Sequence, residues 1–229
     1  MNASAFFALP DSLAVFRPAF SADVRPWEWV KAIGPALEAA DLPAPVDGPL
    51  KGHPLVTVSG RVHIDPTVRF IGAATLIGPA WIGPGVEVRP GAFVRGNVIV
   101  GAGSVLGNSC EYKNCLLLEG VQTMHFNYVG DSVLGNRAHL GAGVVCSNLR
   151  LDQKPVVIAL PDGPAATGLR KLGAILGDDA EVGCNAVLNP GSLLGPGALV
   201  APTLSFSGYL PPRTIARART TVSFIPRRD

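Results

Sequence analysis

The sequence has few charged and few aromatic residues. Charged residues make up 16% of the 229 residues, aromatic residues 7%, and the formal net charge is +2. A balance so near neutrality gives no general reason to expect nucleic acid or an anionic membrane surface as a partner. No apolar run approaches the roughly 20 residues that a membrane-spanning helix needs. The N-terminus lacks a cationic start, and Pro10 and Asp11 interrupt its apolar stretch. We therefore expect a cytoplasmic protein without a signal peptide.

Metal-binding signatures are also scarce. The four cysteines, Cys110, Cys115, Cys146 and Cys184, show no C-x-x-C spacing. Free cysteine behaves as a small buried apolar residue, so we expect packed, reduced thiols. The four histidines do not show the usual spacing of a zinc site, and no metal is expected.

Glycine and proline are abundant, at 27 and 21 residues, which favours turns and short strands. From Val58 an apolar residue recurs every sixth position. This frame comprises Val58, Ile64, Phe70, Leu76, Ile82, Val88, Val94, Val100, Leu106, Tyr112, Leu118 and Met124. It slips by one near Val129 and resumes at Leu134, Leu140 and Cys146. After an interruption it returns at Leu176, Val182, Leu188, Leu194 and Val200.

A period of six fits neither an α-helix nor a flat strand, but it is typical of short strands joined by repeating tight turns. The prediction is therefore an all-β protein built as a parallel β-helix, in which each coil covers its neighbour.

Three segments are expected. Residues 1–54 form an N-terminal extension with a short helix that starts after Asp23, and the role of the extension is open. Residues 55–212 form the β-helix, from which a hairpin-like loop at 149–173 is ejected, and residues 213–229 form a basic tail. Loops that leave a rigid scaffold commonly carry binding residues.

Within the repeat, one stretch departs from the apolar pattern and carries recognisable short sequence motifs. They are Gly107-Asn108, Glu111-Tyr112-Lys113-Asn114, His125 with Tyr128, Gly130 and Asp131, Leu140-Gly141-Ala142-Gly143, Asn148, and Lys154. This stretch resembles the acetyltransferase domain of the bifunctional glucosamine-1-phosphate acetyltransferase/N-acetylglucosamine-1-phosphate uridylyltransferases. Thr167 to Ala174 is similar to the archaeal sugar-1-phosphate nucleotidylyltransferase/acetyltransferases. The resemblance covers roughly residues 58 to 212.

The resemblance implies a left-handed β-helix, three hexapeptides to a coil, and a homotrimer. Positions eighteen apart would then stack in one column. Arg95 and Lys113 are so related, and so are Arg89, Gly107 and His125.

His125 follows a frame residue and should point outward, where an imidazole can remove a proton from an attacking amine near neutral pH. We predict His125 as the general base, with Glu111 orienting or polarising it. Stacked Arg95 and Lys113 would make a site for the dianion of a sugar 1-phosphate. The alternative to Arg95 is Arg89, because its local sequence, Arg-Pro-Gly, matches the family's motif better.

By the resemblance, Tyr128 and Lys154 are further phosphate contacts, while Asn148 and His139 face the amine or a neighbouring hydroxyl. His139 stands where the bacterial enzymes have an asparagine, so the acceptor sugar is open. The donor would be acetyl-coenzyme A, lying along the later coils. Backbone N–H groups near Ala142 would hold its thioester, and Arg213 and Arg217 its nucleotide phosphates.

The expected function is an acetyl-coenzyme A dependent N-acetyltransferase that acts on an amino-sugar 1-phosphate or a related nucleotide-linked amino sugar. Too few residues precede Val58 for a nucleotidylyltransferase domain, so uridylyl transfer is not expected; a separate partner could supply it. The alternatives are an O-acyl or acyl-carrier-protein-dependent transferase, and a non-catalytic trimeric sugar-nucleotide-binding protein. A γ-type carbonic anhydrase shares the fold but needs three convergent histidines.

Overall fold

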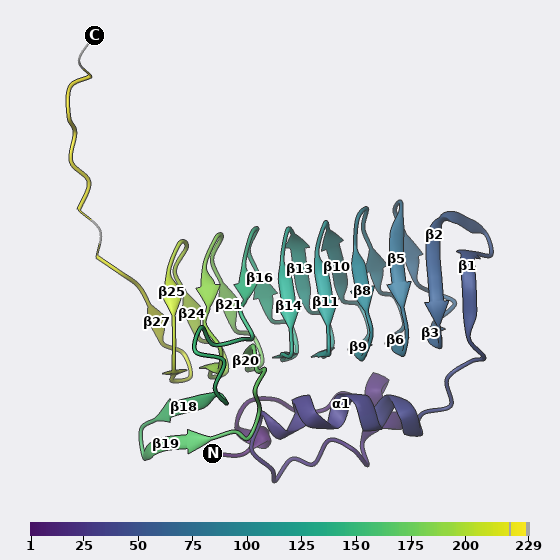
Figure 1. The fold of residues 1–229 in the computed structure, drawn as a ribbon, viewed down its shortest axis with the longest axis horizontal. Helices are drawn as coiled ribbons and strands as arrows, with labels where there is room; N and C mark the ends of the chain where they lie inside the picture. The colour runs from purple at the N-terminus through teal and green to yellow at the C-terminus, as the bar shows by residue number, and fades with distance from the viewer. Residues whose placement is uncertain (220, 228–229) are drawn as a thin grey trace.

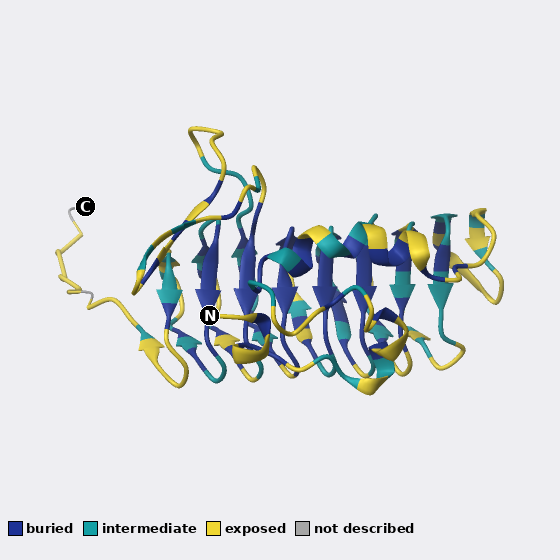
Figure 2. Ribbon diagram, turned by 90° about the horizontal axis from the view of Figure 1, so that it is seen from below, coloured by how far each residue is buried: buried dark blue, intermediate teal, exposed yellow. Residues whose placement is uncertain are grey.

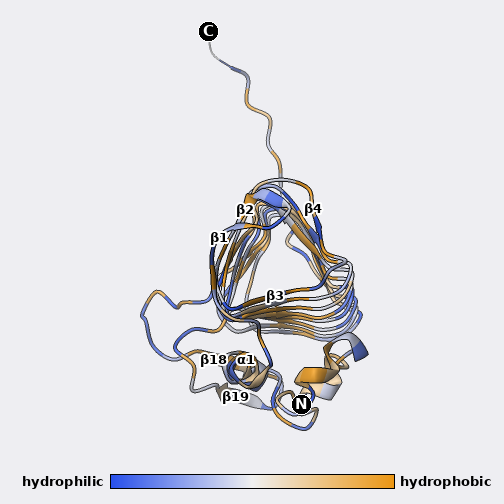
Figure 3. Ribbon diagram, turned by 90° about the vertical axis from the view of Figure 1, so that its right-hand side faces the viewer, coloured by the Kyte–Doolittle hydropathy of each residue, from blue (hydrophilic) through white to orange (hydrophobic). Residues whose placement is uncertain are grey.

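The chain folds into a triangular parallel β-helix, seen along its length in Figure 1 and end-on in Figure 3. The computed structural model describes residues 1–219 and 221–227. Three sheets form the sides of the prism, and the chain visits them in the order A, B, C in each coil. Their strands are parallel except for β1, which pairs antiparallel with β2 at the edge of sheet A. The β-helix prediction is thereby confirmed.

Each sheet stacks one short strand from every coil. Sheet A contains β1 (Val46–Leu50), β2 (His53–Gly60), β5 (Ala74–Ile77), β8 (Phe93–Arg95), β11 (Glu111–Lys113), β14 (Tyr128–Gly130), β17 (Val145–Cys146), β22 (Val187–Leu188) and β25 (Ser205–Phe206). Sheet B contains β3 (Val62–Ile64), β6 (Ala80–Ile82), β9 (Val98–Val100), β12 (Cys115–Leu117), β15 (Val133–Leu134), β20 (Ala174–Leu176), β23 (Ser192–Leu194) and β26 (Tyr209–Leu210). Sheet C contains β4 (Arg69–Phe70), β7 (Glu87–Val88), β10 (Val105–Asn108), β13 (Gln122–His125), β16 (His139–Leu140), β21 (Glu181–Val182), β24 (Leu199–Val200) and β27 (Ile215–Ala216).

The aliphatic frame fills the inside of the prism. Leu76, Val94 and Leu106 are fully buried there and belong to one continuous core. Each further coil buries more apolar area at about 25 cal/mol per Å², so the stack stabilises itself coil by coil. The strands extend beyond the expected domain limits: β1 and the start of β2 precede residue 55, and β27 follows residue 212.

The predicted frame is wrong at two positions. Leu117, not Leu118, pairs with Val100 on sheet B and points into the core, five residues after Tyr112. Leu118 is also buried, but against the N-terminal extension on the outside of the sheet. On the next strand, β13 of sheet C, Thr123 and not Met124 is the inward residue, and it pairs with Leu106. A polar residue is accommodated there because Thr123 Oγ1 lies 2.6 Å from the buried Tyr112 hydroxyl.

The N-terminal extension covers the outer face of sheet B. It consists of two short 3-10 helices, η1 (Ala3–Ala5) and η2 (Asp11–Phe16), followed by α1 (Glu28–Ala39), with Pro35 inside α1. Figure 2 shows α1 lying across successive strands, whose covered residues are buried. Trp29 and Ile33 join Ile99 and Leu116 of sheet B in a second apolar core. Sheets A and C keep their outer faces uncovered by this extension (Figure 3).

The ejected loop forms the expected hairpin. Strand β18 (Val157–Leu160) pairs antiparallel with β19 (Gly163–Ala166), and buried Ile158 joins the outer core on sheet B. The loop closes where it began, because Leu149 and Lys171 form an antiparallel bridge. Beyond β27 the described tail runs away from the prism (Figure 1). Residues 220, 228 and 229 of the expected 213–229 tail lie outside the described residues.

No helix in the described part of the chain is long and apolar enough to cross a membrane. All four cysteines are free, three of them buried and Cys184 exposed. Among residues 1–219 and 221–227, no three His, Cys, Asp or Glu side chains are grouped to hold a metal ion.

Candidate active site

A cluster of polar side chains lies on the outer face of sheet A, where the strands run into sheet B. We call it the polar cluster; it comprises Arg95, Glu111, Lys113, Tyr128, Asp131 and Asn148. Because residues alternate along a strand, Glu111 and Lys113 point outward on either side of the buried Tyr112. The cluster therefore sits on a rigid surface that the repeat itself provides.

The register places Arg95 beside Lys113. Val94 pairs with Tyr112, so the residues that follow them stack in one column. Arg95 Nε also approaches Glu111 Oε1 to 2.6 Å. The alternative residue, Arg89, directly follows β7 on sheet C and donates to Glu87 at 2.7 Å. The stacking of positions eighteen apart predicted Arg95 and the local motif offered Arg89 as the alternative; the structure brings Arg95, and not Arg89, to Lys113.

Asp131 holds the cluster together from the corner between sheets A and B. Its buried carboxylate accepts hydrogen bonds from Asn114 Nδ2 at 2.8 Å and from Asn148 Nδ2. Lys113 Nζ lies 3.7 Å from the same carboxylate. Asp131 adopts a left-handed backbone, φ 49°, which aspartate tolerates better than most residues. Sequence analysis included Asp131 in the recognised wording but gave it no role.

Tyr128 connects the cluster to the next coil. Its hydroxyl accepts a hydrogen bond from Asn148 Nδ2 at 3.1 Å, and partial burial raises the pKa of the phenol. The close approach requires Gly130, because a Cβ there would lie 2.5 Å from the Tyr128 hydroxyl and 2.8 Å from Asn148 Nδ2. The predicted residues Tyr128 and Asn148 are thus in contact, and Lys113 and Asn148 share Asp131 as a partner.

His125 lies at the other end of the strands, on the corner between sheets C and A. It pairs with Asn108, not with Gly107, so the predicted column of Arg89, Gly107 and His125 is wrong. The cause is the five-residue step between Tyr112 and Leu117, which shifts the later coil by one residue. The side chain is exposed. In the described residues no hydrogen bond joins it to Glu111, whose carboxylate instead faces Arg95.

Ala142 occupies the same corner one coil later. The Gly143 N–H donates to the His125 carbonyl at 3.0 Å, which fixes the two corners against each other. Continuing along this corner, the register Leu140, Val182, Val200 and Ala216 leads to Arg217. We call this line, through Ala142, Cys184 and Arg217, the donor edge, because the sequence analysis expects the acyl donor along the later coils. Arg213 lies on the corner between sheets B and C and is not on the donor edge.

His139 and Lys154 also stand apart from the polar cluster. His139 lies on the outer face of sheet C between Gln122 and Glu181, beside a shallow cavity of about 380 Å³. Lys154 is exposed on the ejected loop. The sequence analysis missed Lys171, which the Leu149 bridge places beside Asn148 at the base of that loop. The signal available was its position in the Thr167 to Ala174 wording.

Comparison with known proteins agrees with this architecture. The family model of the GMPPB C-terminal domain matches residues 76–196. The bifunctional protein GlmU of Methanococcus vannielii is 29% identical over 167 residues, 73% of this chain and 39% of GlmU. The bifunctional sugar-1-phosphate nucleotidylyltransferase/acetyltransferase of Sulfurisphaera tokodaii is 33% identical over 136 residues, 59% of this chain and 34% of that protein.

A third relative matches this chain more evenly. YaiX of Escherichia coli K12, described as an uncharacterized acetyltransferase, is 33% identical over 156 residues, 68% of each chain. In contrast, the chain spans less than two-fifths of the two bifunctional relatives. The matched model covers more than half of the 229 residues. The chain belongs to the family of the GMPPB C-terminal domain, within the left-handed β-helix, hexapeptide-repeat acyltransferases.

Proposed function

We propose that the protein is an acetyl-coenzyme A dependent N-acetyltransferase whose acceptor is an amino sugar that carries a phosphate at C1. The observation that carries the proposal is the order of groups from the corner between sheets C and A along the strands of sheet A. His125 ends β13 at that corner, Tyr128 and Glu111 begin β14 and β11, and Lys113 with Arg95 lie at the far ends of their strands. At about 3.3 Å per residue, Glu111 and Lys113 lie about 7 Å apart along β11, a distance that a hexose phosphate can bridge.

In this proposal the acceptor lies across sheet A, with its phosphate toward Arg95 and Lys113. Arg95 bonds Glu111 through Nε, which leaves the terminal guanidinium nitrogens for phosphate oxygens. Within the described residues, the ion pair that Lys113 makes is a loose one, with Nζ 3.7 Å from the Asp131 carboxylate. Tyr128 and Asn148 would contact the sugar or its phosphate, as would Lys171 or Lys154 from the loop.

The amine would then lie near His125, opposite the thioester. The amine nitrogen attacks the thioester carbonyl carbon, a C–N bond forms and the C–S bond breaks. His125 accepts the proton from the nitrogen and returns it to the departing thiolate of coenzyme A. Ala142 lies one coil away, where its N–H could bind the carbonyl oxygen as negative charge develops.

A homotrimer is part of the proposal because His139 faces a different side of the prism from Asn148. Packing sheet C of one copy against sheet A of another would bring His139 to the polar cluster. Sheet B is unsuitable for this contact, because the N-terminal extension and the ejected hairpin already cover it. Arg217 on the donor edge is the better candidate for the coenzyme phosphates than Arg213.

The test is release of coenzyme A thiol from acetyl-coenzyme A in the presence of amino-sugar phosphates. Thiol release that depends on the acceptor, with mass spectrometry showing one added acetyl group on nitrogen, would support the proposal. Acceptors whose amine is replaced by a hydroxyl are the control for O-acylation. Ligand binding without thiol release would instead indicate a non-catalytic sugar-binding protein.

A further inference from the structure

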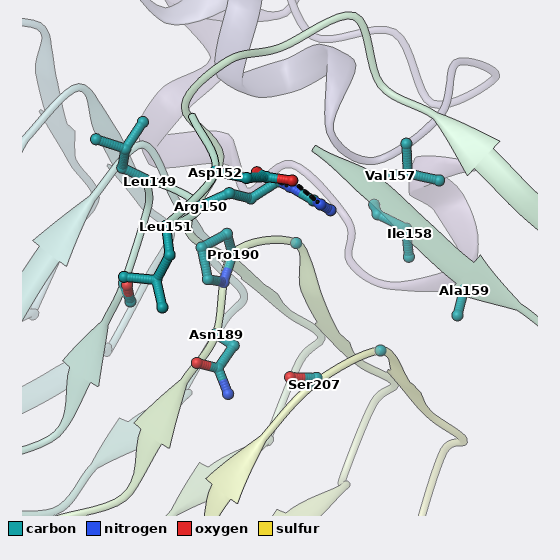
Figure 4. A pocket seen from close by; sticks show the side chains of 13 residues that line it. Leu149, Arg150, Leu151, Asp152, Val157, Ile158, Ala159, Asn189, Pro190 and Ser207 are labelled. Atoms are coloured by element: carbon teal, nitrogen blue, oxygen red, sulfur yellow. Dashed lines mark hydrogen bonds and ion pairs between the residues drawn. The ribbon is translucent and has the colours of Figure 1, made fainter. Parts of the chain in front are cut away.

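A cavity of about 730 Å³ lies between the ejected hairpin and the later strands of sheet A. We call it the hairpin cavity. Figure 4 shows Val157, Ile158 and Ala159 of β18 on one side, with Asn189, Pro190 and Ser207 facing them. Its volume falls in the range of about 300–1,000 Å³ typical of small-molecule sites. None of the predicted site residues lines it.

The hairpin cavity continues the line of the polar cluster. Val129, Cys146, Leu188 and Phe206 pair in successive coils. The next residue in each coil therefore forms an outward column: Gly130, Ser147, Asn189 and Ser207. Lys113 pairs with Gly130 at the start of this column. The Tyr128 hydroxyl and Asn148 Nδ2 lie over Gly130, so the polar cluster reaches Ser147, where the cavity begins.

The lining of the cavity carries no net charge. Its charged residues, Arg150 and Asp152, bind each other through two hydrogen bonds of 2.9 and 2.7 Å. This bond to Arg150 lowers the pKa of the Asp152 carboxyl, so the pair stays ionised and mutually neutralised at neutral pH. The remaining lining mixes hydroxyl and amide groups with apolar side chains. Such a surface suits an uncharged heterocycle and a ribose, and offers no free cation to a phosphate.

The coenzyme would lie elsewhere. The donor edge follows the corner between sheets C and A, where the strands of sheet A begin. The hairpin cavity lies where those strands end, beside the corner with sheet B. A ligand in the cavity would therefore approach the acceptor's phosphate from the side opposite the amine.

We propose that the hairpin cavity is a nucleoside subsite and that the acceptor is a nucleoside-diphosphate-linked amino sugar. This inference rests on the proposed function, because it takes the polar cluster as the site of the phosphate at C1. A nucleoside attached through that phosphate group would extend beyond Tyr128 and Asn148 toward Ser147 and into the cavity, whereas a sugar 1-phosphate would leave the cavity unused.

The experiment compares two exposed alanines on the same hairpin. Ala159 lines the hairpin cavity, and Ala166 of β19 lies outside its lining. The variants Ala159→Trp and Ala166→Trp are assayed for thiol release with glucosamine 1-phosphate and with UDP- and GDP-linked glucosamine. Binding of UDP and GDP alone is measured by calorimetry, and circular dichroism checks the folding of each variant.

For the wild type we expect kcat/KM at least about tenfold higher with a nucleotide-linked acceptor than with the sugar phosphate. Ala159→Trp should abolish that preference and weaken nucleotide binding, while Ala166→Trp should change neither. Equal use of glucosamine 1-phosphate, or nucleotide binding that Ala159→Trp leaves intact, would overturn the subsite. A third outcome separates the two proposals. If the wild type binds nucleotides and Ala159→Trp does not, but no acceptor supports release of coenzyme A thiol, the subsite stands and the transferase assignment fails.

Discussion

Arg95 Nε lies 2.6 Å from Glu111 Oε1, although the two residues belong to successive coils of the β-helix. The ion pair fixes the arginine on the outer face of sheet A, one strand before Lys113. A solvated ion pair of this kind contributes little to stability, about 0–1 kcal/mol. In the proposed site, the ion pair serves to position Arg95, because it orients the guanidinium within the column that also contains Lys113.

The first prediction follows from this geometry. Replacing Arg95 with alanine should raise the KM for the phosphorylated acceptor by about 10- to 100-fold, the effect of losing charged hydrogen bonds of about 1.5–3 kcal/mol. Arg89→Ala is the matched control, because Arg89 binds Glu87 on sheet C. Steady-state kinetics would decide between them, and a larger effect at Arg89 would remove Arg95 from the site.

The second prediction concerns the base. His125→Ala should lower kcat by about 10²- to 10⁴-fold, the contribution of a positioned proton acceptor. The melting temperature should stay unchanged, because the side chain is exposed. His53→Ala provides an exposed histidine far along the chain as the control. Turnover that survives in His125→Ala would show that another group accepts the proton.

The sequence predicts the β-helix well because the inward aliphatic frame is a direct consequence of the fold. The predicted frame fails where a contact other than the inward packing of the repeat determines whether a residue is apolar or polar. Leu118 is apolar because the N-terminal extension covers it, and Thr123 is polar because Tyr112 supplies a partner. A periodic pattern cannot separate burial inside the prism from burial beneath a covering segment.

The site was predictable to a similar degree. The motif wording identified Lys113, Tyr128 and Asn148, which the structure brings together. The local motif matched Arg89 better, and Arg95 was predicted instead from the eighteen-residue stacking, which the register between coils confirms. Lys171 was missed because it is 23 residues from Asn148 in the sequence. The two residues lie side by side only because the ends of the hairpin loop meet in space. His139 and Asn148 lie on different sheets, a separation that requires the three-dimensional coil.

The third prediction assigns Asp131 the role of positioning Lys113 and Asn148. Asp131→Asn keeps the left-handed backbone but turns an amide donor toward the Asn114 and Asn148 donors. We expect a loss of stability of about 1–3 kcal/mol, the cost of an unsatisfied buried group, seen as a lower melting temperature. A rise in acceptor KM should accompany it, because Lys113 and Asn148 lose their common partner.

A matched control is Asp179→Asn. Asp179 also has a left-handed backbone, φ 59°, but it binds Arg137 in solvent on the corner between sheets B and C. That variant should leave both the melting temperature and the KM almost unchanged. If Asp131→Asn lowers stability while the acceptor KM stays constant, Asp131 is structural only.

The fourth prediction uses the cysteines to locate the donor. Burial raises the pKa of the Cys146 thiol to about 12 and also raises the pKa values of the Cys110 and Cys115 thiols. A raised pKa favours the neutral thiol, so these buried groups form almost no reactive thiolate at pH 8. In the native protein iodoacetamide should therefore modify exposed Cys184 alone, and all four cysteines only after unfolding.

Cys184 then reports on the donor edge. It lies beside Gly141, where a Cβ would approach the Cys184 backbone nitrogen to 2.7 Å, and so next to Ala142. Saturating acetyl-coenzyme A should slow the modification of Cys184, and free adenine nucleotides without pantetheine should protect it less. Mass spectrometry of peptides after timed quenching measures both rates. Equal rates with and without the coenzyme would place the pantetheine arm away from the corner between sheets C and A. The thioester would then also lie away from His125, contrary to the proposed mechanism.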